Sequence, residues 1–140
     1  MRILTVCLGN ICRSPYAASV LSHHGGGSVE IRSAGLRSKW AGMPAHERML
    51  GLAAARGYDL TGHRAVRVAP DLLEWANVIL AMDRAVLTEL RGQMDANTPR
   101  RFALALYLGD RDVPDPYGGD EAAFAACADI IEAGARQHIA

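Results

Sequence analysis

The chain has 140 residues, of which 50% are hydrophobic, and its 15 basic side chains balance its 15 acidic ones. This length is typical of one domain whose core is large enough to fold without structural disulfides or metal. A balanced charge argues against a nucleic-acid partner, because proteins that bind nucleic acids are usually basic. The sequence therefore predicts a single domain over residues 1–140.

The cysteine count and the N-terminal segment indicate the compartment. Three cysteines are an odd number, and the first residues lead straight into an apolar strand with no signal-peptide pattern. No apolar run reaches the ~18 residues that a membrane span needs. We therefore expect a cytoplasmic protein with reduced thiols and no membrane insertion.

The hydrophobic pattern of the first half of the chain alternates between strand and helix. Residues 1–6 predict a buried strand, and Ser14 and Pro15 predict the N-cap and first turn of a helix that ends at Gly25. A second strand is predicted over residues 29–33, and a second helix over residues 44–56.

The second half continues the alternation. The pattern predicts a short helix over 70–75, a strand over 77–82, a helix capped by Asp83 that runs to Arg91 with Gly92 beyond its end, and a helix over 120–138; residues 101–108 are ambiguous. Alternating strands and helices predict an α/β fold with a parallel sheet covered on both faces. Such sheets bind ligands beyond the carboxyl ends of their strands, and the first strand ends at Cys7.

The segment after the first strand has the composition of a phosphate-binding loop. Gly9 and Asn10 tolerate the left-handed backbone that turns N–H groups inward as an anion nest, and a helix N-terminus adds to it. Arg13 can form two hydrogen bonds to a phosphoryl group, and Ser14 can donate one to Cys7. The N–H groups and Arg13 favour the nucleophilic thiolate of Cys7.

Other interpretations of the same residues stay open at this point. Cys7 and Cys12 are also consistent with two small core residues, or with half of a metal site that lacks a second Cys/His pair. Ser14 is also consistent with a helix cap alone. The order of cysteine, glycine, asparagine, arginine and serine at a strand-to-helix junction favours the phosphate-binding interpretation.

This string, CLGNICRSP at residues 7–15, resembles the phosphate-binding loop of the low-molecular-weight protein tyrosine phosphatases. The resemblance continues in the family's order at 33–35 (SAG), 62–63 (GH), 79–83 (ILAMD) and 115–117 (DPY), so it covers nearly the whole chain. It implies a single doubly wound α/β domain with a four-stranded parallel sheet flanked by helices. The phosphate-binding loop would lie at the carboxyl end of the first strand.

The candidate general acid is Asp115, which lies between Pro114 and Pro116. From the residues alone, a type I turn before a helix explains this segment equally well. Asp110 and Asp112 are competitors without flanking prolines. The resemblance favours Asp115, because Asp-Pro-Tyr matches the family's general-acid loop.

The resemblance also implies the roles of the other site residues. Cys7 would be the nucleophile, Arg13 the phosphate clamp and Asp115 the general acid and then base, with no metal and no cofactor. Trp40 and Tyr117 would line the substrate site, although Trp40 lies one position later than the family's usual aromatic residue. The implied phosphate-binding and loop-supporting residues are Leu8, Gly9, Asn10, Ile11, Cys12, Ser14, Ser33 and His63.

Further residues have smaller expected roles. The family pattern implies that Cys12 can trap an oxidised Cys7 as a disulfide. Cys127 is predicted in the core, because it lies on the apolar stripe of the last helix. Asp83 is expected to cap a helix and to have no catalytic role. Gly118 stands where the family often has a second tyrosine, a change that concerns specificity.

The leading hypothesis is therefore hydrolysis of protein phosphotyrosine through a phosphocysteine intermediate. A protein arginine phosphatase is the nearest alternative, but that subfamily tends to have threonine where this chain has Ile11. An arsenate reductase would need further cysteines within residues 75–95, and a phosphocarrier would have little use for Arg13 together with Asp115. We expect a phosphotyrosine-containing protein partner, such as a tyrosine kinase, and a monomer or weak dimer.

Overall fold

The computed structural model describes residues 1–94 and 103–139 of the chain. One parallel sheet has the strand order β2-β1-β3-β4 and is formed by β1 (Arg2–Cys7), β2 (Glu30–Gly35), β3 (Val78–Ala81) and β4 (Ala103–Leu106). The helices are α1 (Arg13–Gly25), α2 (Glu47–Ala55), α3 (Pro70–Trp75), α4 (Arg84–Gln93) and α5 (Glu121–Ala135), with a 3-10 turn η1 (Gly26–Ser28). The predicted fold class is confirmed.

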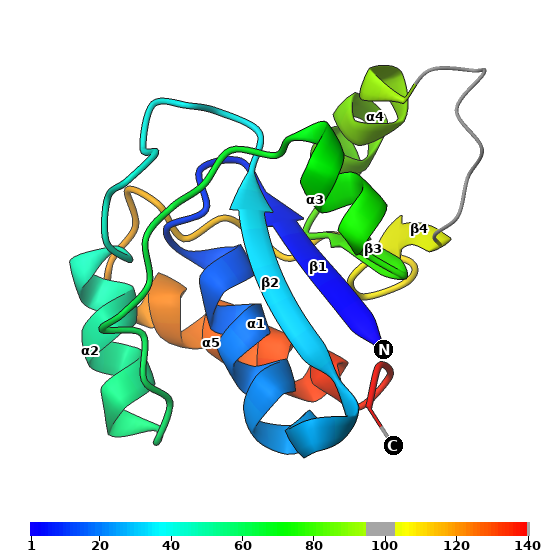
Figure 1. Cartoon of the computed structure of the whole chain (residues 1–140). Helices are drawn as coiled ribbons and strands as arrows, with labels where there is room; N and C mark the ends of the chain where they lie inside the picture. The colour runs from blue at the N-terminus through cyan, green and yellow to red at the C-terminus, as the bar shows by residue number, and fades with distance from the viewer. Residues whose placement is uncertain (95–102, 140) are drawn as a thin grey trace.

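Helices cover both faces of this sheet (Figure 1). On one face, α1, α5 and the outer helix α2 pack over Ile3 and Leu80. On the other face, α3 and α4 pack over Leu4 and Ile79. Because neighbouring residues of β1 point to opposite faces, this central strand is apolar along nearly its whole length, as in other fully covered parallel sheets.

The strand order places a switch point at the carboxyl end of β1. After β1 the chain passes through α1 to β2 on one side, and it later returns to β3 on the other side. Two segments therefore diverge at neighbouring strand ends, which is where doubly wound sheets bind ligands. Cys7 ends β1 there, and Asp83 follows the end of β3.

The structure corrects the prediction that Ser14 caps α1. The helix begins at Arg13 with Cys12 at the N-cap position, and no side chain caps it. Ser14 is the second residue of the helix, and its hydroxyl contacts the Cys7 sulfur. The first helical N–H groups are left available for an anion.

Other element boundaries shift by a few residues. α2 begins at Glu47, because the His46 imidazole accepts a hydrogen bond from the Arg48 N–H at 3.1 Å and caps the helix there. The Asp83 cap on α4 is confirmed, but α4 continues through Gly92. The ambiguous segment contains β4, while its residues 101 and 102 lie outside the described residues. No helix of the described residues has the length and apolarity to cross a membrane.

Candidate active site

The loop between β1 and α1 is held in one shape by Asn10. Its backbone has a φ of 59°, and it is the only non-glycine residue with a positive φ in the described part of the chain. This conformation directs the Asn10 N–H at the Cys7 sulfur, 3.2 Å away. The end of β2 packs directly against this loop at Gly35. Only glycine fits there, because a Cβ would lie 2.9 Å from the carbonyl carbon of Gly9.

Cys7 is 3% exposed and contacts two hydrogen-bonding groups. The Ser14 hydroxyl oxygen lies 2.9 Å from the sulfur and also accepts a hydrogen bond from Asn10 Nδ2 at 2.8 Å. The same hydroxyl lies 3.4 Å from the Ala34 carbonyl oxygen, so its hydrogen can point to that carbonyl or to the sulfur. The Asn10 N–H and the Ser14 hydroxyl therefore both lie within hydrogen-bond distance of the Cys7 sulfur.

Arg13 is 2% exposed, and acidic groups surround it. Its Nη1 donates to Asp83 Oδ2 at 2.7 Å and to the Val113 carbonyl at 2.9 Å, and Nη2 lies 3.6 Å from Asp115 Oδ2. Burial lowers the pKa of Arg13, but Cys7 and the two carboxylates outweigh it and raise the pKa overall. The guanidinium is therefore charged and fixed in orientation.

Asp83 is the residue that the sequence analysis missed. Besides capping α4, it forms the ion pair that orients Arg13. One signal was available: Asp83 lies two residues beyond the end of β3, the strand next to β1, and the carboxyl ends of neighbouring parallel strands meet at one edge of the sheet.

The Asn10 side chain connects the loop to two other segments. Nδ2 donates to Ser33 Oγ at 2.9 Å as well as to Ser14, and Oδ1 accepts from the Val66 N–H at 2.9 Å. His63 Nε2 lies 2.7 Å from the Asn10 carbonyl oxygen. Asn10, Ser14, Ser33 and His63 thus form one hydrogen-bonded network, which the sequence analysis expected from the resemblance.

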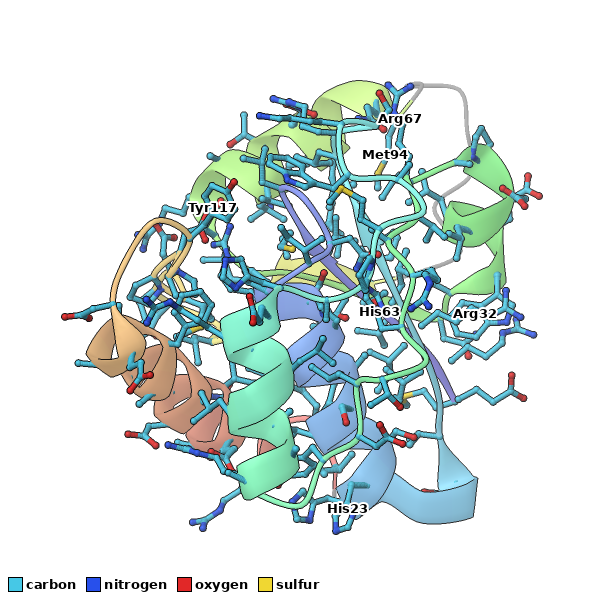
Figure 2. All side chains as sticks on the ribbon, turned by 90° about the vertical axis from the view of Figure 1, so that its left-hand side faces the viewer. His23, Arg32, His63, Arg67, Met94 and Tyr117 are labelled. Atoms are coloured by element: carbon cyan, nitrogen blue, oxygen red, sulfur yellow. The ribbon has the colours of Figure 1, made fainter. Side chains whose placement is uncertain are left out.

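The surroundings of His63 favour its neutral form. Burial lowers its pKa and outweighs the hydrogen bond to Asn10, which raises it. A neutral imidazole with its proton on Nε2 donates to the Asn10 carbonyl. Figure 2 shows His63 on the stretch that follows α2 and passes beside α1.

Asp115 lies on the segment that leads into α5 and is 42% exposed at its side chain. The Val113 N–H donates to the Met82 carbonyl at 2.7 Å, which ties the start of this segment to the end of β3. Of the two competing aspartates, Asp112 is engaged elsewhere, because its carboxylate accepts a hydrogen bond from the Arg84 N–H at 2.9 Å.

These groups meet in one small pocket. It is lined by Cys7, Leu8, Gly9, Ile11, Cys12, Arg13, Trp40, Asp115 and Tyr117. The Trp40 and Tyr117 rings form its wall, edge to face with centroids 5.9 Å apart. Gly9 permits this wall, because a Cβ there would come within 2.7 Å of the Trp40 ring. Figure 2 shows Tyr117 above the N-terminal ends of α2 and α5.

The other two cysteines stay protonated. Burial, followed by the nearby Cys7, raises the pKa of Cys12, and burial raises the pKa of Cys127 to about 12. Cys127 is 1% exposed, which confirms its predicted place in the core. Within residues 1–94 and 103–139, no group of three or more His, Cys, Asp or Glu side chains is arranged to hold a metal ion.

A buried cysteine and arginine in one pocket at the switch point of this fold are typical of a cysteine-dependent phosphatase, and comparison with known proteins specifies the family. The family model described as "Low molecular weight phosphotyrosine protein phosphatase" matches residues 2–140. The chain belongs to this family. It is 36% identical over 132 residues to the "Probable low molecular weight protein-tyrosine-phosphatase EpsP" of Ralstonia nicotianae, an alignment that covers 94% of this chain and 89% of that protein.

Solved structures agree with this assignment. The Vibrio vulnificus protein Wzb in complex with benzylphosphonate is 27% identical with a TM-score of 0.88, over 97% of this chain and 94% of that one. The Drosophila arginine phosphatase is 29% identical with a TM-score of 0.89, over 98% of this chain and 94% of that one. The fold therefore serves phosphatases with two kinds of substrate.

Proposed function

We propose that this protein hydrolyses phosphotyrosine in proteins, with Cys7 as nucleophile, Arg13 as phosphate clamp and Asp115 as general acid and base. The observation that carries the proposal is the convergence of these three side chains on one pocket. The thiol contributes a nucleophile, the guanidinium a fixed positive charge, and the carboxyl group a proton. No one of them would support turnover alone.

In the first step, the Cys7 thiolate attacks phosphorus. An S–P bond forms, the P–O bond to tyrosine breaks, and its electron pair leaves on the phenolic oxygen, which takes the proton of Asp115. Arg13 and the loop N–H groups hold the equatorial oxygens as their charge redistributes. The Asp83 carboxylate, which accepts a hydrogen bond from Arg13 Nη1 at 2.7 Å, would hold the guanidinium in position for this contact.

In the second step, water attacks the phosphocysteine. Its oxygen forms a bond to phosphorus, the S–P bond breaks, and Asp115 accepts the proton that the water releases. The electron pair returns to sulfur, where the Ser14 hydroxyl and the Asn10 N–H stabilise the thiolate as a leaving group.

The pocket wall supports an aromatic substrate. Trp40 and Tyr117 can stack on a tyrosyl ring whose phosphate lies at the bottom of the pocket. Protein phosphoarginine is the second candidate, because a relative of this fold is an arginine phosphatase. The buried Ile11 in the pocket lining favours an apolar ring over a guanidinium.

The test is the initial rate of phosphate release from a phosphotyrosine peptide and from a phosphoarginine peptide, with Cys7→Ser as the blank. We expect turnover of phosphotyrosine that vanishes in the blank. Asp115→Asn should lower kcat about 10²–10⁴-fold on the phosphotyrosine peptide, whose leaving group is poor, and much less on a substrate with a good leaving group. Release from phosphoarginine alone would overturn the substrate assignment, and no release would favour a phosphate-binding module.

The wider expectations form part of the same proposal. The protein would act in the cytoplasm on phosphotyrosine-containing proteins such as a tyrosine kinase, as a monomer or weak dimer that folds as one domain over residues 1–140. Cys12 would form a disulfide with an oxidised Cys7, and this disulfide would keep the oxidation of Cys7 reversible. Both cysteines are buried, form no disulfide and line the pocket.

A further inference from the structure

A second hollow lies next to the phosphate pocket, between α2 and α5. It encloses about 630 Å³ and is lined by Glu47, Arg48, Gly51, Leu52, Glu121, Phe124 and Ala125. The two helices lie side by side, and the segment that carries Tyr117 leads into α5 at one end of the hollow (Figures 1 and 2). We call this hollow the α2–α5 groove.

Three neighbouring aromatic rings connect the lining of the groove to the mouth of the phosphate pocket. The Tyr117 ring, which lines the phosphate pocket, lies 5.8 Å from the His46 ring between centroids. The His46 ring lies 4.8 Å from the Phe124 ring, which lines the groove. An extended chain advances ~3.3 Å per residue, so residues within about three positions of a bound phosphotyrosine can reach the groove.

The groove combines an apolar floor with an acidic rim. Leu52, Phe124 and Ala125 form the floor, whereas Glu47 and Glu121 are the exposed first residues of α2 and α5. Among the described residues, neither glutamate makes an ion pair. Two carboxylates outnumber the single guanidinium of Arg48, so the groove carries a net negative charge.

We propose that the α2–α5 groove binds the polypeptide beside the phosphotyrosine and selects a basic side chain there. This inference rests on the proposed phosphatase function. A lysine or arginine fits the groove because its aliphatic stem covers the apolar floor while its cationic end reaches the glutamates. Exposed charge pairs contribute modestly, so the preference corresponds to about a fivefold gain in kcat/KM.

The first measurement compares phosphotyrosine peptides that differ at one position. Arginine, alanine or glutamate is placed in turn at each of the three positions before and after the phosphotyrosine. Para-nitrophenyl phosphate, which has no flanking residues, reports the chemical step alone. We expect arginine to raise kcat/KM at one or two positions, alanine to be intermediate, and glutamate to be poorest.

Gly51 offers a way to fill the groove without touching the phosphate pocket. It lies within α2, and a Cβ at this position would meet nothing within 4 Å. Gly51→Leu should therefore fold, abolish the arginine preference and leave para-nitrophenyl phosphate turnover unchanged. Gly92→Leu is the matched control, because Gly92 is an exposed, unobstructed glycine of α4, far from the groove along the chain.

A variant without the two glutamate charges distinguishes an effect on peptide preference from an effect on helix stability. Acidic residues at helix starts also stabilise helices, so Glu47→Gln with Glu121→Gln is expected to lower the melting temperature slightly. A purely structural role would leave the ranking of peptides unchanged, whereas the proposal requires the arginine preference to disappear.

Each outcome is decisive. Equal rates for all peptides, a preference for glutamate, or an arginine preference that survives Gly51→Leu would each overturn the groove proposal while para-nitrophenyl phosphate turnover still supports the phosphatase. If the unmodified protein hydrolysed none of these substrates, that result would instead contradict the proposed function.

Discussion

At the scale of single residues, the arrangement of Arg13 depends on a residue far away in the chain. Its guanidinium is almost fully buried, and a buried charge is costly unless a partner of opposite charge compensates it. Asp83 is that partner at 2.7 Å. The same carboxyl group caps α4, so one side chain stabilises both a helix start and the orientation of the proposed clamp.

The substitution Asp83→Asn separates the capping of α4 from the ion pair with Arg13. Asparagine keeps a cap acceptor but loses the charge, so we expect a loss of about 1–3 kcal/mol in the free energy of unfolding and about a tenfold fall in kcat/KM. Asp83→Ala should cost about 1 kcal/mol more, because it also removes the cap. Urea titration and steady-state kinetics measure both; unchanged kinetics in Asp83→Asn would show that the Val113 carbonyl orients Arg13 unaided.

A second prediction at the scale of single residues concerns how His63 makes the stability of the protein depend on pH. Its folded-state pKa lies below its ordinary value, so the unfolded chain binds a proton at a pH at which the folded chain does not. Stability from this group is fully present above the ordinary histidine pKa of about 6.5 and falls as the pH drops through the folded-state pKa. Below that lower pKa, the loss is complete.

His63→Gln keeps an N–H donor for the Asn10 carbonyl but does not titrate. We expect the melting temperature of the unmodified protein to fall more steeply than that of the variant as the pH is lowered from 8 to 5. Thermal denaturation at matched ionic strength measures both slopes. Parallel curves would contradict the assignment of a neutral, half-buried His63.

At the scale of elements, β2 and the phosphate loop are in backbone contact. Gly35 ends β2, and a Cβ on this residue would lie 2.9 Å from the Gly9 carbonyl carbon and 3.0 Å from the Asn10 nitrogen. Backbone atoms cannot rotate away, so any side chain at this position must displace the loop.

Gly35→Ala should therefore damage activity more than stability. Overpacking costs about 1–3 kcal/mol, whereas a displacement of the loop by about 1 Å can lower kcat about 10²-fold. Gly92→Ala is the control, since it lies in open space on α4 and should stabilise the protein by up to about 1 kcal/mol. Normal kcat in Gly35→Ala would show that the loop adapts without loss.

Element types were largely predictable, because they depend on local patterns. The apolar runs of β1 and β3 and the Asp83 cap are local signals, and the corresponding elements formed within a few residues of their predicted bounds. β4 was ambiguous because three of its four residues are exposed or only half-buried, so its strand character depends on pairing with β3.

Site geometry was less predictable, because it depends on contacts between distant segments. The resemblance predicted a network of Asn10, Ser14, Ser33 and His63, and the structure brings these four residues into hydrogen-bonding contact. Local rules assigned Ser14 to a helix cap, but its hydroxyl bonds across the loop to Cys7. No local rule could pair Arg13 with a carboxylate 70 residues further along.

At the scale of the whole molecule, two core clusters lie on opposite faces of one sheet. They share β1 and β3, whose successive side chains enter alternate clusters. Neither cluster can be exposed without disrupting strands that the other also needs. We therefore expect the two faces to unfold together.

The two tryptophans can test this cooperativity. Trp40 packs against the cluster beneath α1 and α5, and Trp75 against the cluster beneath α3 and α4. Trp75→Phe and Trp40→Phe each leave one fluorescent probe, on opposite faces of the sheet. Within each variant, we expect fluorescence and far-ultraviolet circular dichroism to give the same urea midpoint, and non-coincident midpoints would indicate two independently unfolding parts.

The phosphate loop is itself part of one of these clusters. Cys7, Ile11 and Cys12 are buried core residues, so the loop that would bind phosphate also contributes to the hydrophobic core that stabilises the fold. An oxyanion bound there acts by mass action as a folding ligand and adds about 2.7 kcal/mol at a concentration one hundred times its Kd. Product phosphate would thus both inhibit this protein and protect it from heat and proteolysis, so its lifetime would depend on the chemical it releases.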